Sequence, residues 1–367
     1  MNPLALLFAL FLIAGILWDA FETVVLPRRV SRRLRIAMLA LAPAWRTYSA
    51  LMRRIPPGGK RETYLSYYGP LTTILLLTVW AIGLIFGFGL LHWGLGSHIS
   101  SPDRVPTLAT DLYLSGTTFF TLGLGDVVPR TTGARLVTIA EAGIGFGFLA
   151  LIISYLPVLY QAFSQREVRI TLLDAWAGSP PTAVEFLKRL GEYDHVSALD
   201  PFLEKWEEWA ADLLDSHIAY PNLCFYRSEH DNQSWLAALT TILDACAVVM
   251  AGVDGVRSRT AGLTFAMARH AVVDLSQILN RTPRAPEPDR LPPEDLTRLR
   301  QILAEAHLAL HPSRAFEERL AELREMYEPY VHALSGFLLM PLPAWIPPPG
   351  IRDNWQRSKW KTIAHFH

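Results

Sequence analysis

The sequence TLGLGD, at residues 121–126, stands between two apolar runs and decides the fold. The first run, 71–93 (LTTILLLTVWAIGLIFGFGLLHW), contains no Asp, Glu, Lys or Arg, and the second, 136–160, contains only Glu141. Both are long enough to cross a bilayer, which takes about 20 residues. A third apolar run extends from Pro3 to Pro27 and contains only two charged residues, Asp19 and Glu22. We therefore expect an all-α membrane protein with three transmembrane helices, at 1–27, 71–93 and 136–160.

The composition excludes several other classes of protein. Of the 367 residues 51% are hydrophobic and 19% are charged, with a mean hydropathy of +0.21, against about 25% charge in an average soluble protein. Lys and Arg balance Asp and Glu at 34 each, so no net charge points to a nucleic-acid partner. Two cysteines, Cys224 and Cys246, cannot build a disulfide scaffold, and we expect both to be reduced.

The N-terminal run has two interpretations. A cleaved signal peptide is one, but Met1-Asn2 carries no positive charge and no small-residue cleavage site follows, so we favour a retained helix. Near its end lie Asp19 and Glu22. They form either a proton relay or, as we prefer, an interfacial pair of acids neutralised by Arg28 or Arg29.

The segment 28–69 sets the orientation. It carries ten Lys and Arg residues before its first acid, Glu62. Basic loops stay in the cytoplasm, so we expect the N-terminus outside and the C-terminal part in the cytoplasm. Arginine outnumbers lysine 29 to 5, which is typical of a high-GC bacterial genome, so we expect the inner membrane of a bacterium. Within this loop 36–45 (IAMLALAPAW) is too short to span, and we expect an interfacial helix there.

The segment between the two long runs combines a short amphipathic stretch, 110–120 (TDLYLSGTTFF), with the alternating glycines of 121–126. Glycine permits backbone conformations that other residues resist. Non-helical backbone at membrane depth is tolerated only where protein or water covers it. We therefore expect a re-entrant loop: a short helix over 110–120 followed by a non-helical strand.

The order of helix, short helix, T-x-G-x-G-D and helix over 70–162 resembles the pore domain of potassium channels, whose filter reads TVGYGD. In that family carbonyl groups from four subunits replace the hydration shell of the ion. The resemblance implies that potassium binds Thr121, Leu122, Gly123 and Leu124, that Gly125 turns the chain, and that Asp126 lies at the outer mouth. The filter occurs once per chain, so a ring of four requires a homotetramer.

Two residues depart from the family pattern. Leu122 replaces Val or Ile, and Leu124 replaces Tyr, whose hydroxyl group holds the filter in the family; leucine cannot make that bond. Thr117 stands where some relatives have an acid, so Asp126 lacks that partner. Glu141 is either exposed at the outer interface or, as we favour, in polar contact with Thr117 or Thr118 behind the filter.

The run 136–160 contains candidates for gating. Gly143, Gly145 and Gly147 form either a hinge or sites of close helix packing, and Pro157 is expected to kink the helix near its inner end. No arginine-rich span is present that would serve as a voltage sensor.

The residues 163–340 have an ordinary soluble composition, and apolar residues recur in them at spacings of three and four. A cytoplasmic α-helical bundle is predicted. We expect its helices at 184–190, 199–218, 235–249, 263–279, 296–310 and 316–339. No nucleotide-binding glycine motif follows a strand, so the regulatory ligand stays unknown.

Some polar groups of this part invite a functional interpretation that we do not favour. His217, Cys224, His230 and His270 match no regular zinc spacing. His270 and Asp274 are expected to form a solvated pair.

The tail, 341–367, combines a Pro-rich stretch with Trp355 and Trp360 among basic residues. We expect it to pack on the bundle, the alternative being contact with an anionic membrane surface.

Together these features predict a potassium-selective channel rather than an enzyme, with the lipid bilayer and potassium ions as its partners, no cofactor, and regulation by the helical bundle. The alternatives are a weakly selective cation channel, favoured by Leu124, and a membrane-anchored helical sensor that conducts nothing.

Overall fold

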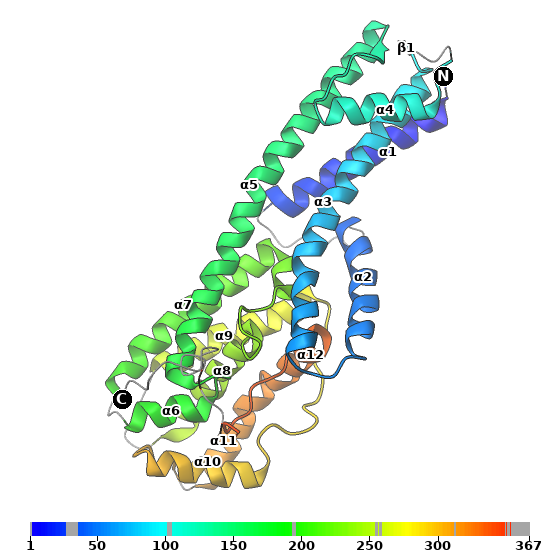
Figure 1. Ribbon diagram of the computed structural model, residues 1–367. Helices are drawn as coiled ribbons and strands as arrows, with labels where there is room; N and C mark the ends of the chain where they lie inside the picture. The colour runs from blue at the N-terminus through cyan, green and yellow to red at the C-terminus, as the bar shows by residue number, and fades with distance from the viewer. Residues whose placement is uncertain are drawn as a thin grey trace, which may run out of the picture. The chain divides into compact units, whose positions relative to one another are not determined.

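A computed structural model of the chain describes residues 2–26, 36–100, 105–192, 196–253, 256, 259–311, 313–348, 350 and 353, without the side chains of 36–42. Within these residues the fold is helical almost throughout (Figure 1). Its two named strands, β1 (Ile99–Ser100) and β2 (Val128–Pro129), pair antiparallel with Ile99 opposite Pro129. The chain is an all-α membrane protein, as the hydropathy pattern predicted.

The chain divides into two compact units. The first contains residues 1–51 and 68–161, and the second contains residues 52–67 and 162–367. Both divisions fall inside long helices, α3 (Gly59–Leu95) and α5 (Thr132–Ala177). Each helix is therefore longer than its apolar run, because hydropathy marks only the part that faces lipid. The first glycine or proline after Pro157 is Gly178, and α5 ends just before it.

The first unit also contains α1 (Pro3–Ala20) with a π-helical turn at Phe21–Val25, α2 (Ile36–Met52) and the short helix α4 (Leu108–Phe119). The helix α2 continues seven residues beyond the predicted 36–45 and includes Pro43. Helices α1 and α3 pack closely at Gly87. A Cβ atom added at Gly87 would lie only 2.7 Å from Cγ1 of Ile13. Small residues permit such approach between membrane helices. The outer face of α1, including Phe11, is exposed and apolar.

The second unit is built around α8 (Trp235–Gly252). Every residue of α8 from Trp235 to Val249 is buried, and the helix contacts α6, α9, α11 and α12. By length and composition α8 could cross a membrane, as could α1 with its π-helical turn, α3 and α5. A helix that is apolar all round is also what the centre of a bundle requires, and here protein covers it.

The remaining helices of this unit (Figure 1) are α6 (Ala183–Glu192), α7 (Leu199–Ala219), α9 (Arg259–Ile278), α10 (Pro293–Glu305), α11 (Arg314–Glu325) and α12 (Glu328–Leu338), with 3-10 turns at Val196–Ala198 and Pro221–Phe225. Of these, α7 packs against α9 and α10 packs against α6, while the others contact α8 directly. The single helix predicted at 316–339 is wrong: the structure has two, α11 and α12, joined at Met326 and Tyr327. Pro329 explains the break, because proline donates no hydrogen bond within a helix and favours its first turn.

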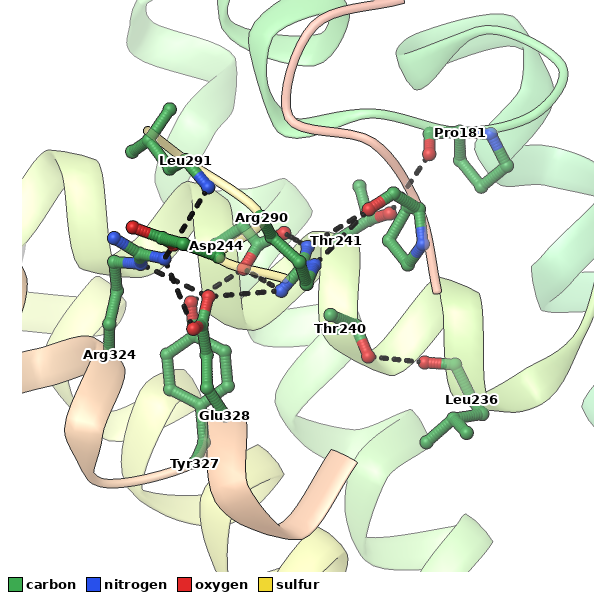
Figure 2. Close-up of polar contacts among 12 residues, drawn as sticks. Pro181, Leu236, Thr240, Thr241, Asp244, Arg290, Leu291, Arg324, Tyr327 and Glu328 are labelled. Carbon is green, nitrogen blue, oxygen red and sulfur yellow. Dashed lines mark hydrogen bonds and ion pairs between the residues drawn. The ribbon is translucent and has the colours of Figure 1, made fainter. Parts of the chain in front are cut away.

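A buried polar cluster, consisting of Asp244, Arg290, Arg324, Tyr327 and Glu328, connects α8 to the C-terminal half of this unit (Figure 2). Arg290 binds both carboxylate oxygens of Asp244, and the Tyr327 hydroxyl group donates to Asp244 over 2.5 Å. Arg324 reaches Glu328 over 3.0 and 3.1 Å. The charges are thus paired where water is excluded, which a buried charge requires.

Candidate functional site

The short helix α4 places the start of the 121–126 segment. Thr107 caps its N-terminus in a reciprocal pair with Thr110, and the chain leaves the helix at Phe120. Asp111, fully buried in its first turn, accepts a hydrogen bond of 2.5 Å from Ser97, which follows α3. Capping and this bond fix the helix at both its N-terminus and its flank.

The backbone φ angle alternates in sign along the 121–126 segment. Thr121, Gly123 and Gly125 have φ angles of +57°, +54° and +81°, while Leu122 and Leu124 stay outside the positive region. The amides of Leu122 and Gly123 both face α4, since they donate to the Thr117 carbonyl group over 2.8 and 3.3 Å. Glycine adopts these left-handed angles without the steric cost that Cβ imposes, so the alternating glycines are what this backbone requires.

The carbonyl groups of this segment are free. Among the hydrogen bonds of the described residues, none is accepted by the carbonyl oxygens of Thr121 to Gly125. The side chains of Leu122 and Leu124 are exposed by 62% and 63%. Residues 121–125 are all exposed, so these five carbonyl oxygens are available to water or to a ligand that takes oxygen donors, such as a cation.

Asp126 has a partner that the sequence did not indicate. It accepts from the Tyr113 hydroxyl group over 2.9 Å and from the amide of Val127 over 3.0 Å. Tyr113 lies one turn before Thr117 on α4, so a phenol hydroxyl group of this helix, and not residue 117, binds Asp126. Beyond Asp126 the loop is closed by the pairing of β1 with β2 and by the Arg130 amide, which donates to the His98 carbonyl group over 2.9 Å.

The predicted contact of Glu141 with Thr117 or Thr118 is wrong. Glu141 is fully buried on α5 and its carboxyl group contacts the Ser115 hydroxyl group, with Nε2 of His92 at 3.9 Å. The Thr117 hydroxyl group instead donates to the Leu114 carbonyl group within its own helix, over 3.0 Å. Thr117 lies about 200° around the helix from Ser115, so it cannot share the face that meets Glu141. Glu141 therefore contacts α4 at Ser115 rather than at Thr117 or Thr118.

The three glycines of α5 differ in their surroundings. A Cβ atom at Gly145 would overlap the carbonyl group of Phe119, the last residue of α4, whereas Gly143 and Gly147 have no neighbour within 4 Å of that position. Gly145 is therefore a packing site. The helix continues through Pro157 to Ala177.

The acids of the first helix are buried and bound by tryptophans. The indole of Trp80 donates to Asp19 over 2.9 Å, and that of Trp18 donates to Glu22 over 2.7 Å. The predicted pairing with Arg28 or Arg29 lies outside the described residues, as do Trp355 and Trp360 of the tail.

The remaining candidates lie apart in the second unit. No group of three His, Cys, Asp or Glu residues placed to hold a metal occurs in the part of the chain that the structure describes. Cys224 and Cys246 are free and buried, and His217 is buried against Arg166. His270 and Asp274 do pair, at 3.5 Å, with His270 exposed.

Comparison with known proteins agrees with this geometry. The family model described as "Ion channel" matches residues 73–161, which contain α4, the 121–126 segment and most of the apolar parts of α3 and α5. The chain is 25% identical over 198 residues to YdjJ, an uncharacterized membrane protein of Bacillus subtilis; the match covers 53% of this chain and 57% of YdjJ. It is 32% identical over 94 residues to protein LctB of Bacillus caldotenax, covering 23% of this chain and 69% of LctB.

A viral relative matches a shorter stretch. The potassium channel protein kcv of Paramecium bursaria Chlorella virus 1 is 43% identical over 43 residues, which is 12% of this chain and 46% of that protein. No solved structure matches the chain. The chain thus spans little more than half of YdjJ but more than two thirds of LctB. The residues matched by the family model include the free carbonyl groups of 121–125. The chain belongs to the ion-channel family.

Proposed function

We propose that the chain forms a potassium-selective channel in which four copies surround one ion pathway. The observation that carries this proposal is the row of free carbonyl groups from Thr121 to Gly125, on backbone whose amides face α4. Rings of such carbonyl groups replace the hydration shell of potassium in selectivity filters. The potassium channel protein kcv, one of the relatives, supports this choice of ion.

The tetramer follows from the number of filters. One chain supplies one strand, and a strand cannot surround an ion. The apolar side chains of α5 also need cover, since Leu136, Ile139, Phe146 and Ile153 are each exposed by more than 60%. In the assembly that we propose, lipid, neighbouring copies and the pathway share these surfaces.

The proposed orientation uses the basic residues of 28–61. The N-terminus lies outside, the protein crosses the inner membrane of a bacterium three times, and the second unit lies in the cytoplasm. The protein conducts ions down their gradient, without enzymatic activity or a cofactor.

We also propose that the second unit regulates the channel. Two sets of contacts within this unit support the proposal. Arg166, on the part of α5 beyond the membrane, donates to the carbonyl groups of Leu223 and Tyr226 over 3.0 and 2.9 Å. Glu62, at the start of α3, pairs with the buried Arg227 at 3.7 Å. A rearrangement of the bundle would therefore move the ends of both helices that carry the pore.

Potassium uptake into liposomes by the purified full chain tests the function. Gly123→Ala forces a Cβ atom into a left-handed conformation, at a cost of about 1 to 2 kcal/mol, and we expect it to abolish uptake while the native mass stays that of four 41.2 kDa chains. The matched control, Gly133→Ala, lies in the first turn of α5 with open space around it and should conduct normally.

The same experiment separates the alternatives. Equal uptake of sodium and potassium by the unmodified protein would support the weakly selective channel that Leu124 favours. Absence of any uptake under every condition, or a monomeric native mass, would contradict the proposal and support the non-conducting sensor.

A further inference from the structure

Three helices of the first unit meet at one buried polar point. Ser115 of α4 and Glu141 of α5 are fully buried, and His92 of α3 is 1% exposed. The Ser115 hydroxyl group contacts both Oε1 of Glu141 and the carbonyl oxygen of Ile85 on α3, the latter at 2.7 Å. We call Ser115, Glu141 and His92 the buried triad.

The hydrogen atoms of the buried triad can be counted. A serine hydroxyl group has one hydrogen, and the Ile85 carbonyl group can only accept it. The contact between Ser115 and Glu141 then needs a hydrogen from Glu141, because a carboxylate would place lone pair against lone pair. A neutral carboxylic acid lets Ser115 donate to the Ile85 carbonyl group and accept from Glu141, so that neither contact places two lone pairs against each other.

The alternative is an ionised Glu141 opposite a charged His92. Oε2 of Glu141 and Nε2 of His92 are 3.9 Å apart, and neither has a hydrogen-bond partner among the described residues. A charge pair at full burial needs close, hydrogen-bonded geometry to offset its loss of hydration. That geometry is missing here, and the neutral acid is the less costly state.

The buried triad lies less than two helical turns before the filter, which begins at Thr121. Ser115 precedes Thr117 by two residues, and the Thr117 carbonyl group accepts from the amides of Leu122 and Gly123. Gly145, one turn after Glu141 on α5, allows the end of α4 to approach closely. A bond between Glu141 and Ser115 thus fixes the rotation and height of the helix end that holds the filter amides.

We propose that Glu141 is a positioning residue for selectivity: as a neutral acid it donates to Ser115 and so holds α4, and with it the filter, against α3 and α5. This rests on the proposed channel function. Leu124 stands where the family has a tyrosine whose hydroxyl group holds the filter. The buried triad supplies support through the C-terminal end of α4, which leads into the filter.

The test compares three full-length variants in liposomes by their ratio of potassium to sodium uptake. Glu141→Gln keeps one donor and one acceptor without charge, and should preserve the ratio within about twofold. Glu141→Leu removes both and should lower the ratio about tenfold, the equivalent of one lost hydrogen bond. The control is Thr138→Val, which removes a hydroxyl group from α5 that donates to the Ala134 carbonyl group of its own helix.

Two results would overturn the proposal: an unchanged ratio in an assembled Glu141→Leu protein, or an equal loss in Glu141→Gln, which would require an ionised Glu141. A second measurement does not depend on conduction. The infrared band of a protonated carboxylic acid should be present in the unmodified protein at neutral pH and lost in Glu141→Gln. If the unmodified protein conducts nothing the channel function fails, and the presence or absence of this band still decides the state of Glu141.

Discussion

At the scale of single residues, Gly145 has a role that its neighbours Gly143 and Gly147 do not share. A Cβ atom there would meet the carbonyl carbon of Phe119 at 2.9 Å, whereas Gly147 has open space. Gly145→Ala should push α5 away from α4 and destabilise the protein by about 1 to 3 kcal/mol. Thermal unfolding in detergent measures the loss, with Gly147→Ala as the matched control.

A hinge at Gly145 would give a different result. If flexibility rather than close packing were its purpose, Gly145→Ala would leave the unfolding temperature unchanged and alter only the rate of opening.

His217 gives a prediction for pH. Burial, aided by the charge of Arg166, lowers the pKa of His217 well below 6.5, and its Nδ1 atom lies 2.7 Å from the Leu213 carbonyl oxygen. Below about pH 6.5 the unfolded chain therefore takes up a proton that the folded protein does not. Stability should fall with falling pH, by up to about 1.4 kcal/mol per unit from this group.

The variant His217→Gln keeps a donor and an acceptor but does not titrate. Thermal unfolding of the full chain between about pH 7 and pH 5 should show a weaker pH dependence in this variant than in the unmodified protein. Equal slopes in the two proteins would contradict the assignment.

At the scale of elements, the cluster around Asp244 decides how α8, α12 and the loop before α10 are held together (Figure 2). Asp244→Asn leaves the guanidinium of Arg290, 8% exposed, without its main countercharge. Removing one partner of a buried pair costs about 3 to 5 kcal/mol, so we expect a loss of this size in denaturant unfolding.

The control for this prediction is an exposed pair. Arg314 and Glu318 are 89% and 61% exposed at 2.9 Å, and Glu318→Gln should produce no measurable change. An Asp244→Asn protein as stable as the control would show that Arg290 gains enough from Glu328 and the Pro343 carbonyl group alone.

At the scale of the whole molecule, α3 begins in the second unit and α5 ends in it. Burial raises the pKa of Glu62, opposed by the attraction of Arg227, and burial lowers the pKa of Arg227 to about 10. Arg227 also donates to the Leu338 carbonyl group over 2.6 Å, at the end of α12. The pair therefore connects the start of α3 to the C-terminal part of the bundle.

A double-mutant cycle tests whether this connection regulates the channel. Glu62→Gln and Arg227→Gln should each change the open probability in single-channel recordings, and the double variant should change it no further than either one. Open probability that is unaffected by all three variants would exclude α3 as a route of regulation. The exposed pair Arg314 and Glu318 again serves as control.

The features that depend on local sequence were predictable. Apolar length set the membrane helices, spacings of three and four set α6 to α10, and the alternating glycines of 121–126 set a non-helical segment behind a short helix. Each of these follows from the properties of one stretch of chain, and needs no knowledge of its neighbours.

Contacts between stretches were not predictable. The sequence alone determined the membrane character, most of the helices and the non-helical segment at 121–126, since hydropathy and glycine conformation act locally. Tertiary structure decided that Ser115, not Thr117 or Thr118, meets Glu141, that Tyr113 holds Asp126, and that Asp19 binds Trp80. These pairs depend on the rotation of each helix about its axis, which packing against other helices sets.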